Sequence, residues 1–536
     1  MNFFRKKAIP TTPFGCRKDA EPDLSRIQNY FLHKTHTNAA HILSDRTCND
    51  LDLQALFAFL DRTNSVIGQQ YLYDTLRAFR TAENRHIDEK FIEKLTNDET
   101  LRNTLHRQLS TLNRFETFYL SSLFQEPLAQ PPKWFFVVKL LSFATTLSLV
   151  LLFINPSLTT VFVSLIIMNF GVHYWNKRNL FRYSESLPEL IKMIQIARRL
   201  SKNNASLPPN SNELQSIQQL EKLQKKMRYF SFESRMQSDI AMLIWALFEI
   251  VKIIFLIEPL LLFTILKQLQ TKTNAIENVF QFVGKVDMHY SIASLRHGLP
   301  NWCKPTNITI NKTLKTKGLY HPLIVNCIKN NIDINGKSVL LTGSNMSGKT
   351  TFIRTIGINI ITSYALNTAF AETFSIRFMP LFSAIRVSDD LLNDKSYYFE
   401  EVLTIKSMLH QSESTQPTIF LLDEIFKGTN TIERIAAGKA VLSYLNRNDN
   451  IVFVSTHDIE LADLLKDEYD LYHFSETVDD KNIDFDYTLK PGKLRRRNAI
   501  KILEINSYPS EIVQEALYLS KQINQLPTRT EKNRTQ

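Results

Sequence analysis

Residues 338–357 read SVLLTGSNMSGKTTFIRTIG, and this stretch sets the architecture of the C-terminal half of the chain. Its first four residues are apolar or small and predict a short buried strand. The segment that follows, Gly343-x-x-x-x-Gly348-Lys349-Thr350, has the spacing of a P-loop, and apolar residues at helical intervals come next. A strand, a glycine-rich loop and a helix in this order predict an α/β domain that binds a nucleotide.

The chemistry of phosphate binding requires this order of residues. Glycines let the backbone turn, so that successive N–H groups and the N-terminus of the helix point at phosphate oxygens. Lys349 would bring a positive charge to the β- and γ-phosphates, and the Thr350 hydroxyl would coordinate Mg²⁺. We therefore predict ATP and Mg²⁺ as cofactors. The residues of this loop predicted to bind them are Gly343, Ser344, Asn345, Met346, Ser347, Gly348, Lys349, Thr350 and Thr351.

Two further apolar stretches predict strands that complete the site. Residues 418–425 read TIFLLDEI and bring two carboxylates to the C-terminal end of a strand. Asp423 would hold the Mg²⁺, and Glu424 would accept the proton of the attacking water, although an Asp-Glu pair at a strand end is otherwise an ordinary surface turn. Residues 451–455, IVFVS, precede His457, which would sense the γ-phosphate. The predicted catalytic residues are Lys349, Glu424 and His457, and the predicted metal ligands are Thr350 and Asp423.

These segments resemble the MutS family, the ABC-type ATPases of DNA mismatch repair. TGSNMSGKTTFIR is similar to the family's Walker A segment, LLDEIFKGTN to its Walker B segment, and STHD to the segment of its switch histidine. Residues 388–402, SDDLLNDKSYYFEEV, resemble the segment that reaches the partner's nucleotide in an ATPase dimer, with Ser396 at the position of its serine. The resemblance covers about residues 320–519. It implies an ABC-type mixed sheet and a homodimer that sandwiches ATP between one subunit's P-loop and the other's Ser396.

The chain also departs from the pattern of that family. Residues 59–72, FLDRTNSVIGQQYL, are similar to the opening of the family's helical core domain, and we expect no mismatch-reading or connector domain before Leu51. Phe91-Ile92-Glu93 has the letters of the mismatch-reading wedge, but it lies within a helical run, so we interpret it as a coincidence. Asp394-Lys395 precedes Ser396 where Gly-Gln is usual, and a missing glycine changes how closely a loop can approach phosphate.

A pair of apolar runs predicts a transmembrane helical hairpin. Residues 134–154, WFFVVKLLSFATTLSLVLLFI, carry a single charge, and residues 158–175 carry none. Each run is long enough to span a bilayer, and Asn155-Pro156-Ser157 would form the turn between them. Basic residues flank the hairpin, so both ends should face the cytoplasm; they are Lys133, Lys177, Arg178 and Arg182. The alternative is a buried helical pair in a soluble core. Because of the predicted hairpin, this chain looks most similar to shortened, membrane-anchored MutS-like proteins.

The rest of the chain reads as mainly helical. The sequence has 536 residues, of which 44% are apolar, and only 13 glycines, and this composition favours long helices. Its four cysteines form no C-x-x-C pair, so neither a disulfide framework nor a zinc site is indicated. The predicted organisation is an N-terminal segment (residues 1–50), a helical region (51–130), the hairpin (131–178), a lever-like helical region (179–300), the ATPase domain (301–520) and a polar tail (521–536).

For one apolar stretch within the lever-like region, residues 240–266, the sequence allows three interpretations: a membrane crossing, a re-entrant pair or a core helix. Because ATP is cytoplasmic, an even number of crossings or none is favoured there. We expect a multi-pass protein of the cell membrane whose ATPase domain faces the cytoplasm.

Three hypotheses for function follow. The first is a DNA-associated ATPase that clamps duplex DNA through phosphate contacts. The net charge of +11 is typical of nucleic-acid binding or of the loops that flank a membrane crossing, and the basic run at residues 495–497 is either a solvated face or a contact to phosphate or anionic lipid. The second is a membrane switch that uses ATP-driven dimerisation to act on an unknown protein partner without DNA. The third, a scaffold that does not hydrolyse ATP, is disfavoured by the intact Asp423-Glu424 pair. Membrane lipid is an expected partner in each case.

Overall fold

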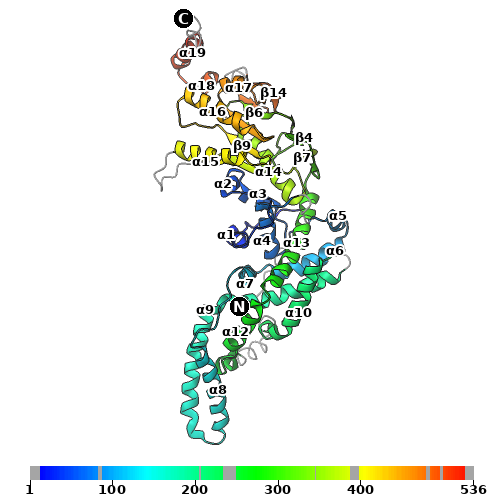
Figure 1. The fold of residues 1–536 in the computed structure, drawn as a ribbon, viewed down its shortest axis with the longest axis vertical. Helices are drawn as coiled ribbons and strands as arrows, with labels where there is room; N and C mark the ends of the chain where they lie inside the picture. Colours follow the sequence, from blue (N-terminus) through cyan, green and yellow to red (C-terminus); the bar gives the residue numbers. More distant parts are fainter. Residues whose placement is uncertain are drawn as a thin grey trace. The chain divides into compact units, whose positions relative to one another are not determined.

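The structure is a computed structural model that describes residues 12–81, 87–203, 207–232, 249–344, 346–386, 397–478, 483–494, 499–506 and 508–525. The chain divides into two units (Figure 1). The first, the helical unit, consists of Met1–Thr37, Phe57–Arg77 and His86–Leu299. The second, the α/β unit, consists of Asn38–Leu56, Ala78–Arg85 and Pro300–Gln536. The structure therefore has a helical region followed by an α/β domain with mixed sheets, and this confirms the broad fold prediction.

Helix α13 (Thr273–Gly298) forms the centre of the helical unit and is buried along most of its length. It packs against α4 (Val66–Arg77), α5 (Glu89–Asn97), α9 (Thr159–Lys202) and α10 (Ser211–Phe232). Two glycines allow α4 and α13 to approach closely. A Cβ atom at Gly68 would lie 2.2 Å from Asp287 Oδ2, and one at Gly284 would lie 2.6 Å from the Cβ of Tyr71. This contact has no room for larger side chains.

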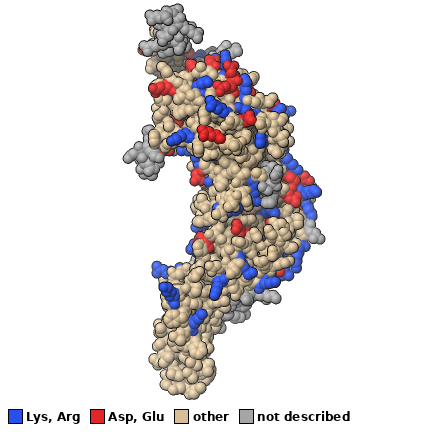
Figure 2. Space-filling view, in the orientation of Figure 1, with Lys and Arg blue, Asp and Glu red and all other residues tan. Residues whose placement is uncertain are grey.

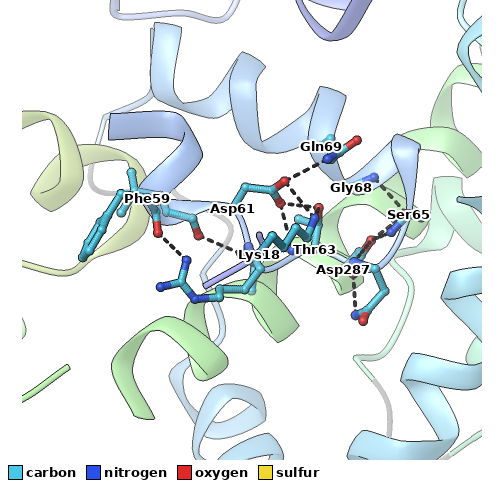
Figure 3. Close-up of polar contacts among 12 residues, drawn as sticks. Lys18, Phe59, Asp61, Thr63, Ser65, Gly68, Gln69 and Asp287 are labelled. Atoms are coloured by element: carbon cyan, nitrogen blue, oxygen red, sulfur yellow. Dashed lines mark hydrogen bonds and ion pairs between the residues drawn. The ribbon is translucent and has the colours of Figure 1, made fainter. Parts of the chain in front are cut away.

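Polar residues of the FLDRTNS segment belong to a buried hydrogen-bonded cluster at the start of α4 (Figure 3). The Asp287 carboxylate, carried by α13, accepts hydrogen bonds from the backbone N–H groups of Asn64 and Ser65, both at 2.8 Å. Asp61 accepts from Lys18 Nζ and Gln69 Nε2, also at 2.8 Å. Asp287 thus satisfies N–H groups at the helix N-terminus from a distant part of the chain, as a capping residue does locally.

Helices α8 (Phe135–Leu152) and α9 are joined by the short η4 (Pro156–Leu158) and form a hairpin (Figure 1). In the described part of the chain, both are long and apolar enough to cross a membrane by length and composition. Outward-facing apolar side chains are exposed, and Figure 2 shows the far end of the hairpin without charge in that view. Trp134 and Trp175 pack edge to face at its base, with ring centroids 4.7 Å apart.

Polar side chains line the inner face of this hairpin where α12 (Ile257–Gln270) packs against it. Asn169 Nδ2 donates to the carbonyl oxygen of Ile254 at 2.6 Å, and Ser142 Oγ donates to that of Phe255 at 2.8 Å. Leu256 follows in a left-handed conformation (φ +51°), so these side chains satisfy carbonyl groups at a break in the helix. Asn176 then donates to Glu258 Oε1 at 3.2 Å.

The break lies within the apolar stretch whose role the sequence left open. Residues 240–248 of that stretch are outside the described residues. Its remaining part is a helical turn, the break at Leu256 and the first residues of α12, which rules out one unbroken helix over the described part.

The main sheet of the α/β unit has the strand order β14-β11-β6-β10-β9-β8 in the part of the chain that the structure describes. All neighbours are parallel except β14 and β11. The predicted strands are confirmed as β6 (Ser338–Thr342), β9 (Ile419–Asp423) and β10 (Ile451–Thr456). The others are β8 (Leu381–Ala384), β11 (Tyr469–His473) and β14 (Lys490–Pro491). Because β6, β9 and β10 are parallel neighbours, their C-terminal ends meet at one edge.

Helices flank this sheet: α14 (Lys349–Leu366), α15 (Tyr397–Ser412), α16 (Thr431–Leu445) and α17 (Ile459–Leu465). A second sheet has the order β3-β7-β4-β5, with β3 (Thr306–Asn307), β7 (Thr373–Ile376), β4 (Thr313–Leu319) and β5 (Asn330–Asn335). The remaining elements of this unit are β1 (His41–Ile42), α2 (Asp45–Asp50), β2 (Ala78–Phe79), β12 (Glu476–Val478), β13 (Ile483–Phe485), α18 (Ala499–Ile505) and α19 (Ser510–Gln525).

The helical unit also contains shorter helices, and one of them, α3, spans the point in the sequence where the chain passes from the α/β unit to the helical unit. They are α1 (Leu24–Leu32), α3 (Leu53–Leu60), α6 (Glu99–Leu109), η2 (Ser110–Leu112), η3 (Phe115–Leu120) and α7 (Ser122–Gln125). Phe91 and Ile92 are buried within α5, as the sequence predicted for the wedge-like letters. These side chains serve the helical core.

Candidate nucleotide-binding site

The glycine-rich loop, residues 343–350, connects the buried strand β6 to helix α14. Gly348 precedes the helix with φ +105°, a conformation that glycine adopts without strain. A Cβ atom at Gly343 would lie 2.7 Å from Ser347 Oγ and 2.9 Å from the Phe474 carbonyl oxygen, so a larger residue would not fit. Both glycines of the motif are therefore required by the backbone itself.

Lys349 is folded back onto this loop. Its Nζ donates to the carbonyl oxygens of Gly343 at 2.9 Å and Ser344 at 2.8 Å. The side chain is buried, and burial lowers the pKa of Lys349 to about 8 even though Glu424 and Asp423 act in the opposite direction. The ammonium group of Lys349 therefore lies against the glycine-rich loop.

The two predicted metal ligands are hydrogen-bonded to each other. Thr350 Oγ1 donates to Asp423 Oδ2 at 2.7 Å, and the Ser455 hydroxyl donates to the other oxygen of the same carboxylate. A hydroxyl and a carboxylate are ligands that Mg²⁺ prefers. In the described part of the chain, no group of three or more His, Cys, Asp or Glu side chains could hold a metal. The hydroxyl of Thr350 and the carboxylate of Asp423 are chemically suited to hold a Mg²⁺ ion.

Glu424 and His457, predicted as catalytic residues, lie in contact. His457 Nε2 is 2.6 Å from Glu424 Oε1, and Lys427 Nζ is 2.7 Å from Oε2. Burial raises the pKa of Glu424, but the hydrogen bonds from His457 and Lys427 outweigh it and lower the pKa to about 2. Glu424 also adopts a left-handed conformation (φ +52°), a kind of backbone strain that clusters at functional sites.

A pocket of about 500 Å³ opens beside the loop. One wall is formed by the loop and the start of α14, and Glu424 also lines it. The other walls come from the segment that links β4 to β5 and from Tyr487. Residues of these walls include Tyr320, Ile324, Val325, Asn326, Cys327, Ile328 and Tyr487, and Asn330 of β5 and Phe474 after β11 also line the pocket. The volume suits a ligand of nucleotide size, with a polar end at the loop and an apolar surface opposite.

Two predicted binding residues, Asn345 and Ser396, lie outside the described residues, as does the basic run at 495–497. The remaining predicted residues of the loop lie together at the C-terminal edge of β6, β9 and β10. Sequence reasoning did not single out Lys427, Ser455 or Tyr487. The only signal for the first two was their position next to the DEI and THD segments, and Tyr487 had none because it is distant in the sequence.

Comparison with known proteins identifies this part of the chain. Residues 339–524 match the family model for MutS domain V. The DNA mismatch repair protein MutS of Fusobacterium nucleatum is 28% identical over 222 residues, which are 39% of this chain and 25% of that protein. MutS of Aquifex pyrophilus is 29% identical over 256 residues (45% and 29%), and MutS of Clostridioides difficile is 26% identical over 261 residues (46% and 27%).

These matches confirm the resemblance that the motifs indicated. The chain spans between 25% and 29% of the length of these three relatives. The residues matched by the family model, 339–524, lie within the α/β unit.

Proposed function

We propose that this chain, which is related to the MutS family through its domain V, binds ATP with Mg²⁺ and hydrolyses it in the α/β unit. One observation carries this proposal. The Thr350–Asp423 pair and the Glu424–His457 pair lie at the ends of adjacent parallel strands, directly beside the buried Lys349. Metal ligands, a general base and a phosphate-binding cation are thereby held at one edge of one sheet.

Each residue has a distinct task in the proposed reaction. Backbone N–H groups of the loop bind phosphate oxygens, and Lys349 exchanges its two carbonyl partners for the β- and γ-phosphates. Thr350 and Asp423 would hold Mg²⁺, which neutralises charge on the phosphates. Glu424 would accept the proton of the attacking water, and His457, which contacts Glu424, would sense the γ-phosphate. The apolar wall with Tyr320, Ile328 and Tyr487 would receive the adenine ring.

We further propose that the α8–α9 hairpin anchors the protein in the cell membrane, with the α/β unit on the cytoplasmic side. Helix α8 has 18 residues and so is about 27 Å long, close to the thickness of the hydrocarbon core. A homodimer that pairs the loop of one copy with the Ser396 segment of the other would complete each ATP site, as the family resemblance implies.

The direct test of ATP hydrolysis uses detergent-purified full-length chain. Lys349→Ala should abolish Mg²⁺-dependent ATP binding, whereas Glu424→Gln should bind ATP and lower kcat by about a hundredfold or more and should trap the dimer. Lys466→Ala, an exposed lysine of the same unit, serves as the matched control and should behave as the wild type. Equal hydrolysis rates for wild type and Glu424→Gln would exclude Glu424 as the general base.

Two functions remain candidates for the target of this ATPase. The three relatives described above are named DNA mismatch repair proteins, which favours association with duplex DNA. The exposed apolar hairpin favours the alternative, a membrane switch that acts on a protein partner without DNA. Filter binding to duplex DNA across salt concentrations, with and without ATP, separates them. Affinity that falls steeply with salt supports the first function, and no binding at any salt concentration supports the second.

A further inference from the structure

Asp458 follows His457 and has an unusual hydrogen-bonding pattern. It occupies the N-cap position of α17, where an aspartate normally accepts hydrogen bonds from the first N–H groups of its own helix. Its side chain makes no such capping bond. Both carboxylate oxygens instead bind Arg434, with Nε at 2.8 Å from Oδ2 and Nη2 at 2.7 Å from Oδ1. A bidentate pair of this kind fixes orientation as well as distance.

Arg434 lies in the first turn of α16, which begins directly after the segment that carries Glu424 and Lys427. The start of α16 is itself fixed, because the Asn430 side chain accepts from the backbone N–H of Glu433 at 3.0 Å. The Arg434–Asp458 pair is mostly shielded from water, with the two side chains 25% and 14% exposed. It therefore ties the start of α16 to the turn between β10 and α17.

His457 directly precedes Asp458 in the turn between β10 and α17. Its side chain is 36% exposed, and the Glu424 carboxylate is its close polar partner at 2.6 Å. The backbone after it is held by the N–H of Asp458, which donates to Thr456 Oγ1 at 3.0 Å, and by the Asp458–Arg434 pair. The placement of the imidazole therefore depends on Asp458.

We propose that Arg434 and Asp458 are positioning residues that hold His457 against Glu424 for the reaction. This inference rests on the proposed ATPase function. Without Arg434, the Asp458 carboxylate is released to cap α17, as aspartate does elsewhere, and the adjoining His457 backbone moves with it. Neither Arg434 nor Asp458 lines the nucleotide pocket, so their loss slows the chemical step and leaves ATP binding in place.

The test measures kcat and KM for ATP in the full-length protein. Arg434→Gln and Asp458→Asn should each lower kcat by about tenfold or more, with KM within about twofold of the wild type. Arg434→Lys keeps the charge but not the bidentate geometry, so its kcat should lie between that of the wild type and that of Arg434→Gln. The double variant Arg434→Glu with Asp458→Arg restores an ion pair and should recover most of the lost kcat.

Lys439→Gln is the matched control. Lys439 lies on the same helix and pairs with Glu468 at 3.3 Å, so its loss also removes an ion pair of α16, but one remote from His457. A merely stabilising role for Arg434 would make Arg434→Gln and Lys439→Gln equivalent in kcat, KM and thermal midpoint, and that result would overturn the inference. Failure of the double variant to recover kcat would overturn it as well. Absence of ATP hydrolysis in the wild type would instead overturn the proposed function, and this inference with it.

Discussion

Burial and hydrogen bonding shift the pKa values of single residues in this protein, and His289 is a case outside the candidate site. It is fully buried in α13, its Nε2 accepts from the Asp88 N–H at 2.8 Å, and its Nδ1 therefore donates to the Lys285 carbonyl at 2.7 Å. Burial lowers the pKa of His289 to about 4. Only the neutral ring can make both hydrogen bonds.

This arrangement predicts a loss of stability in acid. Between about pH 6.5 and about pH 4 the unfolded chain binds a proton that the folded chain does not, so the free energy of unfolding should fall as the pH is lowered through this range. The contribution of His289 should reach about 3 kcal/mol at pH 4, as an upper estimate. Chemical unfolding of wild type and His289→Gln across this range measures it, because glutamine can replace both hydrogen bonds without titrating.

His410→Gln provides the control for that experiment. His410 is 83% exposed, so the same substitution there removes a histidine from the surface and not from the core. The prediction would be contradicted if the free energy of unfolding changed equally with pH in His289→Gln and in the wild type.

At the scale of elements, close helix packing depends on particular glycines. Gly284→Ala would place a Cβ atom 2.6 Å from the Cβ of Tyr71 and should destabilise the helical unit by about 1–3 kcal/mol. Gly171→Ala is the matched change, because a Cβ there meets nothing within 4 Å and alanine favours the helix by about 1 kcal/mol. Thermal midpoints should therefore fall for the first variant and stay or rise for the second. Equal midpoints would mean that α4 and α13 are not packed as described.

The polar contacts inside the hairpin make a second prediction for an element. Asn169→Leu removes the donor to the Ile254 carbonyl beside the helix break and should cost about 1–3 kcal/mol. Asn179→Leu is the control, since exposed Asn179 donates to the Trp175 carbonyl of its own helix and not to the helix break. Proteolysis of the detergent-solubilised protein should cleave near Leu256 faster in the first variant than in the second. Equal cleavage would show that Asn169 does not secure the break.

The contrast between elements and contacts explains what the sequence could predict. Strands β6, β9 and β10 and the proximity of Thr350 to Asp423 were predictable, because each motif is local and parallel strands bring their C-terminal ends together. The contact of Lys427 with Glu424 is local, but no motif marks it. The position of Tyr487 in the pocket wall and the capping of α4 by Asp287 were not predictable, because these contacts join segments that are distant in the sequence. The split of α12 from the preceding turn also escaped prediction, since the carbonyl partners at that break come from α8 and α9.

At the scale of the whole molecule, the proposed topology can be tested by labelling. In a background without the four native cysteines, Ser157→Cys at the turn of the hairpin should react with a membrane-impermeant thiol reagent from the outer side of intact cells. Asp449→Cys in the α/β unit should react only after the cells are opened, because that unit is proposed to be cytoplasmic. Reaction of both positions from the cytoplasmic side alone would refute a hairpin that crosses the bilayer.

Helix α9 runs without interruption from the apolar hairpin to Lys202, a length of 44 residues or about 66 Å. Its second half packs against α10 and α13, so anchor and body share one continuous backbone rather than a flexible tether. With the hairpin inserted, the helical unit cannot tumble freely above the lipid surface. If the hairpin is inserted in a bilayer as proposed, any tilt imposed on it by bilayer thickness or curvature would pass to the packed helices, and the protein would then respond to the physical state of the membrane.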